Sequence, residues 1–138
     1  MKKEIYYLVK GFVRFDKKYI LLKKRKSDKP HSSEKWECPG GKIRNNETPK
    51  EAILREIFEE TGLKCEIIKE LPFLEKETDI YKSKCYIYLV KSTSNEVILS
   101  EEHTEFKWVD PYEVKKFDLA LGASSLLKYF NYPVKYLI

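Results

Sequence analysis

Three carboxylates at a helical spacing are the residues of this chain best suited to chemistry. Glu56, Glu59 and Glu60 lie in the stretch GGKIRNNETPKEAILREIFEETGL, residues 40–63. An α-helix turns about 100° per residue, so these three side chains share an arc of roughly 100°. The apolar residues of the same segment fall on a separate face, and they are Ile53, Leu54, Ile57 and Phe58. The segment predicts a helix that buries one side and presents acids on another.

This placement of the acids is poor for helix stability but suits a bound cation. Glu56 and Glu60 are like charges four residues apart, which destabilises a helix slightly. Glu59 and Glu60 also lie in the last turn, where the helix dipole disfavours anions. The chain as a whole carries a net charge of +5. A solvated helix face is the alternative, but a divalent cation such as Mg²⁺ or Mn²⁺, which prefers oxygen ligands, accounts for the repulsion.

The ends of this helix are marked in the sequence. Thr48 can accept a hydrogen bond as the N-cap, and Glu51, three residues later, completes a capping box. Pro49 falls at the first helical position, where it is favoured. Gly62 is a natural C-terminal stop. We therefore expect a helix that runs from Pro49 to Thr61.

The rest of the chain predicts a mixed sheet. Alternating β-branched and aromatic runs indicate strands at residues 4–14, 19–24, 64–70, 83–91, 96–99 and 106–109, with a short extended piece at 36–39. A turn at Asp16-Lys17-Lys18 joins the first two strands, and a polar loop follows at 24–35. Further helices are expected at 111–115 and 120–130. With hairpins and only two main helices, we predict an α/β (α+β) fold with a mixed sheet between helices.

Length and composition place the chain among soluble globular proteins. Its 138 residues suit one domain, 1–138, and 42% are hydrophobic. No run approaches the ~20 apolar residues that a membrane helix needs, and the first residues lack a signal-peptide pattern. We expect a cytoplasmic protein without a membrane partner.

Cysteine and histidine usage argues against a thiolate or histidine metal centre. The three cysteines, Cys38, Cys65 and Cys85, form no CxxC pattern. We expect them to be buried, reduced thiols. The two histidines, His31 and His103, are too few for a site built on histidine.

Residues 41–63 resemble the Nudix box, G-x5-E-x7-R-E-U-x-E-E-x-G-U, in which U is a bulky aliphatic residue. Every specified position of the pattern is met over these 23 residues. The matching residues are Gly41, Glu47, Arg55, Glu56, Ile57, Glu59, Glu60, Gly62 and Leu63. The resemblance implies the Nudix fold, an α/β/α sandwich. It also implies hydrolysis of a nucleoside diphosphate linked to another group, with Mg²⁺ or Mn²⁺.

The resemblance assigns metal ligands by position. Glu59 and Glu60 would be the main ligands, and Glu56 would bind directly or through water. The carbonyl oxygen of Gly40 would add another ligand.

It also implies supporting roles for two further groups. Arg55 would hold Glu56 or Glu47 in place. A loop carboxylate after the box would serve as a ligand or general base, and Glu102, in SEEHTEFKW, is the candidate, with Glu101 as the alternative. The catalytic set implied by the resemblance is Glu47, Arg55, Glu56, Glu59, Glu60 and Glu102.

A basic loop and the double glycine are the predicted substrate contacts. Lys24, Arg25 and Lys26 carry donors suited to phosphate, and Gly41 lies at the start of the box. A solvated loop is the alternative. A nucleic-acid partner is not expected, because no binding motif is present.

Dimers are common among relatives, so a homodimer is kept as an alternative.

The run WECPGGKIRNNETP is similar to the MutT-type branch, which hydrolyses oxidised nucleoside triphosphates to the monophosphate and pyrophosphate. Cys38 departs from the aromatic residue frequent there, and residues 121–123 lack the expected Asn. Tyr81 lies near the position of a tyrosine in diadenosine polyphosphate hydrolases of the family, so that activity is an alternative. An ADP-ribose hydrolase is a weaker alternative. A non-catalytic nucleotide-binding module is the alternative of another class. Aromatic residues that could stack on a base, or belong to the core, are Tyr6, Tyr7, Trp36 and Phe73.

Overall fold

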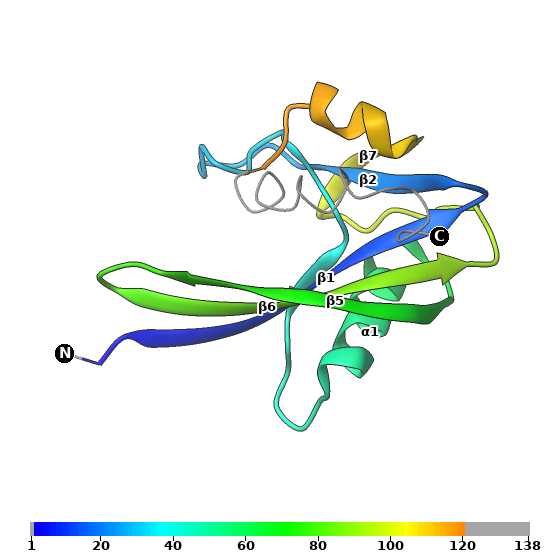
Figure 1. Ribbon diagram of the computed structural model, residues 1–138. Coiled ribbons are helices and arrows are strands. Elements are labelled where there is room, and N and C mark those ends of the chain that lie inside the picture. Colours follow the sequence, from blue (N-terminus) through cyan, green and yellow to red (C-terminus); the bar gives the residue numbers. More distant parts are fainter. Residues whose placement is uncertain (1, 121–138) are drawn as a thin grey trace.

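The structure, a computed structural model, describes residues 2–120 (Figure 1). Its elements are β1 Glu4–Phe15, β2 Lys18–Lys24, β3 Trp36–Glu37, β4 Gly40–Lys42, α1 Pro49–Thr61, β5 Cys65–Glu77, β6 Tyr81–Ser92, β7 His103–Val109 and the 3₁₀ helix η1 Pro111–Lys116. The strands form one sheet in the order β3-β2-β1-β6-β5, with β4 also paired to β1 and β7 to β2. The predicted mixed α/β architecture is confirmed for these residues.

The sheet is mixed because β1 and β6 run parallel while the other pairs are antiparallel. The predicted hairpin between β1 and β2 is present. Its two-residue turn places Asp16 at φ 47° and Lys17 at φ 70°, the pair of positive φ values that matches the twist of the flanking strands.

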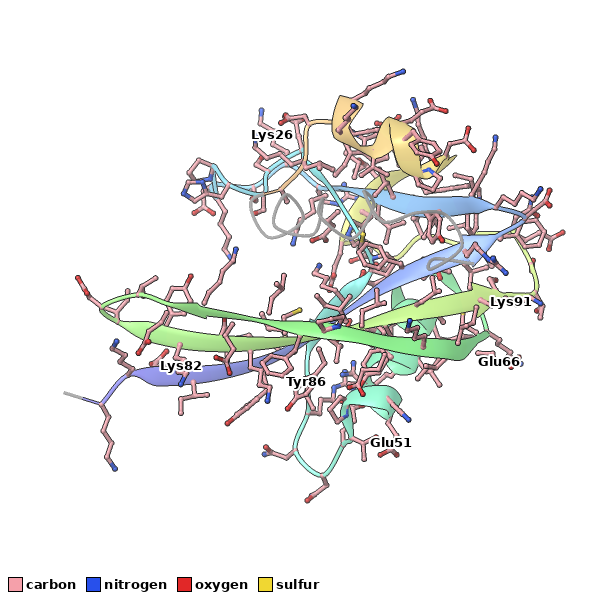
Figure 2. The ribbon with its side chains drawn as sticks, in the orientation of Figure 1. Lys26, Glu51, Glu66, Lys82, Tyr86 and Lys91 are labelled. Carbon is pink, nitrogen blue, oxygen red and sulfur yellow. The ribbon has the colours of Figure 1, made fainter. Side chains whose placement is uncertain are left out.

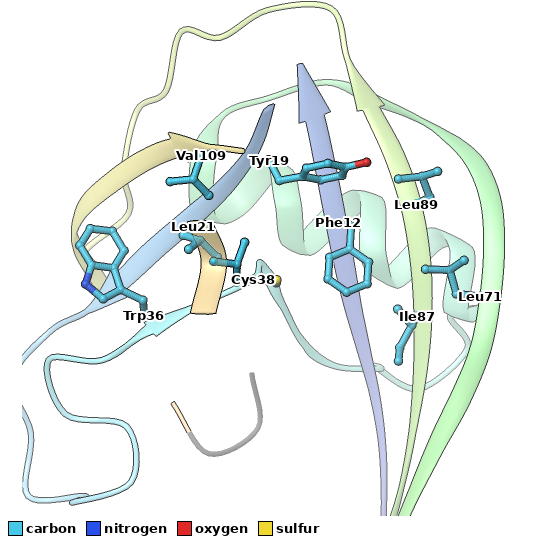
Figure 3. Packing of buried hydrophobic residues seen from close by; sticks show 10 residues of the cluster. Phe12, Tyr19, Leu21, Trp36, Cys38, Leu71, Ile87, Leu89 and Val109 are labelled. Atoms are coloured by element: carbon cyan, nitrogen blue, oxygen red, sulfur yellow. The ribbon is translucent and has the colours of Figure 1, made fainter. Parts of the chain in front are cut away.

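Both faces of the sheet carry an apolar core, because neighbouring residues of each strand point to opposite sides. Val13 and Ile20 pack with Ile53 and Ile57 of α1 on one face. The opposite cluster comprises Phe12, Tyr19, Leu21, Trp36, Cys38, Leu71, Ile87, Leu89, Val109 and Val114 (Figure 3). Val114 belongs to η1, so α1 and η1 lie against opposite faces (Figure 1).

The predicted ends of α1 are confirmed. Thr48 Oγ1 accepts from the Glu51 N–H at 3.1 Å, and Glu51 Oε1 accepts from the Thr48 N–H at 3.0 Å. Gly62 adopts φ 73°, and its N–H donates to the Phe58 carbonyl at 2.8 Å. The helix is therefore pinned at both ends, which fixes the direction of its acidic side chains. Its apolar face is narrower than predicted, because Phe58 is 52% exposed.

The strand predicted at residues 96–99 is wrong. This segment instead caps the C-terminal end of α1: the Ile98 N–H donates to the Thr61 carbonyl at 2.9 Å, and the Ser100 N–H donates to the Glu60 carbonyl at 3.3 Å. The last carbonyls of a helix lack partners within the helix, so they take the N–H groups that a sheet would otherwise have used. Val97 and Leu99 still pack against the α1-side core.

Several strands are longer than predicted, β5 and β7 among them. β5 continues to Glu77 beyond Pro72, because a bulge between Leu71 and Leu74 accommodates the proline on an edge strand. β7 begins at His103, three residues before the predicted start. Its pairing with β2 extends to Lys24–His103 through a register shift between Lys23 and Lys24.

The remaining expectations have mixed outcomes. The short helix at 111–115 is confirmed as η1. The helix predicted at 120–130 lies outside the described residues from 121 onward. Cys38 is buried as predicted, whereas Cys65 and Cys85 are only partly buried. No helix within residues 2–120 is long and apolar enough to cross a membrane.

Candidate active site

Arg55 is the centre of the acidic cluster on α1. Its Nε and Nη2 donate to the two carboxylate oxygens of Glu47 at 2.6 and 2.9 Å. Its Nη1 donates to Glu56 Oε1 at 2.9 Å and to Glu59 Oε2 at 3.2 Å. Nη2 also donates to the Lys42 carbonyl at 3.1 Å. A guanidinium has five N–H donors, so Arg55 uses all of them to hold three acids and β4 together.

The contact with Arg55 stabilises the ionised form of Glu47. Hydrogen bonds from Arg55 lower the pKa of Glu47 to about 2, and Glu47 in turn raises the pKa of Arg55. The Arg44 backbone N–H donates to Glu47 Oε1 at 2.9 Å, and its guanidinium forms an ion pair with Glu59 at 3.2 Å. Repulsion within the cluster is thus offset by two arginines.

Glu60 behaves differently from its neighbours because it is buried, at 2% exposure. Its Oε1 accepts from the Gly40 N–H at 3.1 Å. Among the described residues, its Oε2 has no hydrogen-bond partner. Burial raises the pKa of Glu60 to about 8, against the opposing effect of Lys10. We expected the Glu60 side chain to lie on the acidic face of the helix and away from the core, and the structure instead buries it.

A buried polar network lies beside Glu60. Lys10 Nζ donates to Glu37 Oε1 at 3.1 Å and to the Cys38 carbonyl at 3.0 Å. Glu37 Oε2 lies 2.8 Å from His103 Nε2, and His103 Nδ1 lies 3.9 Å from Glu60 Oε2. Burial raises the pKa of Glu37, but Lys10 and His103 outweigh it and hold the pKa at about 2. The pKa of Lys10 is raised in turn by Glu37 and Glu60, against its own burial.

Sequence reasoning missed Lys10, Glu37 and His103 as parts of the site. Each lies outside the box, on β1, β3 and β7, and only pairing of these strands brings them together. The available signal was a charged residue at an inward position of an otherwise apolar strand, as Lys10 is between Val9 and Phe12.

The donor atoms suit a divalent cation. Glu37, Glu60 and His103 each offer one ligand atom, and these atoms lie within 4.8 Å of one another. Glu56 and Glu59 lie on the same helix as Glu60. A buried carboxylate oxygen without a partner is costly, and a bound cation would remove that cost.

The double glycine makes room for these acids. A Cβ at Gly41 would lie 2.7 Å from Glu56 Oε1, and a Cβ at Gly40 would lie 2.1 Å from the Val9 carbonyl oxygen. Both contacts are closer than real side chains allow, so the absence of a side chain at Gly41 leaves room for the Glu56 carboxylate of α1, and its absence at Gly40 lets β4 pack this near β1.

The loop before β7 is attached to the basic loop after β2. Arg25 donates through its N–H to the Glu102 carbonyl at 2.9 Å and through Nε to the Glu101 carbonyl at 2.6 Å. The side chains of Glu101 and Glu102 are exposed. Arg25 therefore positions the segment that carries Glu102 and leads into His103.

Of the other predicted substrate contacts, Lys24 lies beside the buried network. Lys24 Nζ is 3.8 Å from Glu37 Oε2. Lys26 is exposed, on the opposite side of the β5–β6 ribbon from Glu51 in the first turn of α1 (Figure 2).

The aromatic candidates divide by burial. Trp36 is buried and packs edge-on against Phe117 at 5.3 Å, so it belongs to the core. Tyr7 and Phe73 are each 50% exposed. Tyr6 packs edge-on against Tyr81 at 6.0 Å.

Comparison with known proteins identifies the family. Residues 8–130 match the NUDIX domain. A MutT-like protein of Streptomyces ambofaciens is 30% identical over 86 residues, which span 59% of this chain and about half, 51%, of that protein. The 8-oxo-dGTP diphosphatase of Buchnera aphidicola subsp. Schizaphis graminum is 32% identical over 127 residues, 91% of this chain and 83% of that protein. A crystal structure of a MutT protein from Methanosarcina mazei Go1 superposes with a TM-score of 0.80 at 24% identity, covering 95% of this chain and 96% of that chain.

The chain therefore belongs to the Nudix family. It is a Nudix hydrolase, an enzyme of phosphoric anhydride bonds that acts on the pyrophosphate bonds of nucleotides. A relative and a structural neighbour carry MutT names, and the resemblance seen in the sequence is confirmed.

Replacing Gly41 by Ala should displace the Glu56 carboxylate without unfolding the chain, because the new Cβ meets only the flexible end of that side chain. We expect Mn²⁺ affinity, measured by calorimetric titration, to fall by about tenfold, as when groups that orient metal ligands are disturbed. Gly11→Ala is the control, because its Cβ would press on Ile53 and Ile57 in the core. That variant should lose stability, and an unchanged Mn²⁺ affinity in Gly41→Ala would contradict the account.

Glu47 should make the fold acid-sensitive. Its pKa is lowered from 4.5 to about 2 in the folded state, so its stabilising effect is present above pH ~4.5 and is lost as the pH falls towards ~2. Urea unfolding from pH 6 to pH 2 should show wild type more stable than Glu47→Gln near pH 6, with the difference vanishing at the acid end. The exposed Glu66→Gln serves as the surface-charge control. A difference that does not change with pH would refute the role given to the Arg55–Glu47 pair.

Proposed function

We propose that this enzyme hydrolyses a nucleoside triphosphate, oxidised or not, to the nucleoside monophosphate and pyrophosphate with Mg²⁺ or Mn²⁺. The observation that carries the proposal is the Glu60 carboxylate, buried beside the Gly40 N–H with Oε2 unpartnered among the described residues. A buried acid in this state suits an ion and the phosphates that the ion carries.

The cation would be held by Glu56, Glu59, Glu60 and the carbonyl oxygen of Gly40. When bound, it neutralises charge on the phosphate oxygens and lowers the pKa of a bound water. Glu59 is held by Arg44 and Arg55 and is partly exposed, so it can turn to the ion without crossing the core.

The chain's own residues supply position and proton transfer. Arg55 keeps Glu47 and Glu56 in one orientation, so the site is organised before substrate arrives. The attacking water forms a bond to phosphorus as the bond to the leaving pyrophosphate breaks. The water's proton passes to a carboxylate, and Glu102 is the proposed acceptor, a step worth typically ~10²–10⁴-fold.

The phosphates would be bound by Lys24, Lys26 and the backbone at Gly41, with Arg25 acting mainly through the loop that it holds. An oxidised purine nucleotide is the preferred substrate, supported by the 32% identity to an 8-oxo-dGTP diphosphatase. Cys38, the departure from the MutT-type pattern, is 2% exposed within the apolar cluster. A cysteine at this position, where the MutT-type pattern has an aromatic residue, therefore alters the packing beneath β3 and β4. It leaves the proposed phosphate contacts in place. Residues 121–123 lie outside the described residues.

The proposal is tested with a nucleotide panel of oxidised and normal dNTPs, ADP-ribose and diadenosine polyphosphates, each with Mg²⁺, Mn²⁺ or chelator. We expect metal-dependent release of pyrophosphate from the triphosphates. Glu60→Gln should lose at least about 100-fold in kcat, since it removes a negative ligand but keeps the shape. Glu66→Gln, an exposed acid on β5, is the matched control and should retain full activity.

Circular dichroism and the unfolding midpoint must show that Glu60→Gln remains folded. A folded, fully active Glu60→Gln would overturn the assignment of Glu60. Turnover of ADP-ribose or diadenosine polyphosphates in preference to every triphosphate would overturn the proposed substrate class.

A further inference from the structure

Two buried polar atoms face each other at the end of the network beside Glu60. Glu60 Oε2 and His103 Nδ1 are 3.9 Å apart, and neither has a hydrogen-bond partner among the described residues. The His103 side chain is 0% exposed and that of Glu60 is 3% exposed. Solvent at the surface therefore does not satisfy them, and their separation is too long for a direct hydrogen bond.

The partner of the other ring nitrogen determines what Nδ1 can do. Glu37 Oε1 accepts from the Lys10 ammonium at 3.1 Å, and Oε2 lies 2.8 Å from His103 Nε2. The Glu37 carboxylate, bound to the Lys10 ammonium, acts as an acceptor. His103 Nε2 therefore carries a proton and donates it in a hydrogen bond to Glu37 Oε2. In the neutral ring Nδ1 then presents a lone pair, and Glu60 Oε2 lies 3.9 Å from this nitrogen.

When Glu60 is ionised, its Oε2 and His103 Nδ1 are both electron-pair donors, and a positive group between them would satisfy both. Ligand atoms about 2.1 Å from one octahedral ion lie roughly 3.0 Å apart when adjacent and about 4.2 Å apart when opposite. The observed 3.9 Å falls within this span. A carboxylate that binds the far nitrogen of a metal-ligating histidine is also the usual support for such a ligand, and here Glu37 takes that place.

We propose that His103 Nδ1 is a metal ligand and shares one divalent cation with Glu60 Oε2, while Glu37 and Lys10 fix the tautomer and orientation of the ring. The proposal adds a ligand to the cation site of the proposed function, and a role of His103 in catalysis rests on that proposed function. A nitrogen ligand favours transition ions over Mg²⁺. The site should therefore bind Mn²⁺ or Co²⁺ in preference to Mg²⁺, beyond what carboxylates alone provide.

The test is electron spin echo spectroscopy of the full-length protein with one equivalent of Mn²⁺ and no nucleotide. We expect modulation from a directly coordinated imidazole nitrogen, which shifts when isotopically labelled histidine is incorporated. His103→Gln should abolish this signal and weaken Mn²⁺ binding at least about tenfold, with a smaller effect on Mg²⁺ binding. His31→Gln, which alters an exposed loop histidine, is the matched control and should change neither.

Glu37→Gln provides a second variant that keeps the ring. It should retain the nitrogen signal but weaken Mn²⁺ binding, because the ring loses the acceptor that orients it. Mn²⁺ bound to wild type without nitrogen modulation would overturn the proposal, and would instead indicate a water between Glu60 and His103. That result would leave the proposed hydrolysis untouched, whereas a clear nitrogen signal without turnover of any nucleotide would overturn the proposed function alone.

Discussion

The guanidinium of Arg55 is the interaction on which the site depends. Glu47, Glu56 and Glu59 would repel one another if they met without a partner, and α1 places Glu59 in its last turn, where the helix dipole disfavours an anion. Arg55 contacts all three and also the Lys42 carbonyl, so it joins α1 to β4 and to the loop that carries Glu47. Because its donors form a rigid fork, the acids are fixed in direction. A lysine, with a single point of charge, would not connect four groups in this way.

Glu60 stands outside this arrangement and depends on the sheet. Its carboxylate meets the Gly40 N–H on one side and His103 on the other. Lys10 supplies the nearest buried positive charge, although it is bound directly to Glu37 rather than to Glu60. The molecule thus contains two acid groups of different kinds: a partly exposed one held by arginines, and a buried one that lacks a complete set of partners. In the proposed cation site, Glu60 would need little rearrangement on binding, whereas Glu59 would turn from its arginine partners towards the ion.

The sequence predicted α1 and its acids well because their signals are local. The capping box, the terminal glycine and the helical spacing of the glutamates all act within a few residues. The strand predicted at residues 96–99 was wrong, and the Ile98 N–H instead donates to a carbonyl at the end of α1, far away in sequence. Lys10, Glu37 and His103 were missed for a similar reason. Nothing within β1, β3 or β7 shows that these three strands meet, and only the register of the sheet brings the side chains together. The burial of Glu60 followed from the same packing, because helical spacing indicates a face but not the depth to which it is covered.

The central claim is that the acids of α1, with the buried oxygen of Glu60, hold the cation that acts on the nucleotide phosphates. Anomalous diffraction from crystals grown with Mn²⁺ and a non-hydrolysable triphosphate tests it most directly. The account predicts an anomalous peak within coordination distance of Glu60 Oε2 and of a phosphate oxygen. A nucleotide-bound crystal whose Mn²⁺ lies elsewhere, with Glu60 Oε2 still unpartnered, would contradict it.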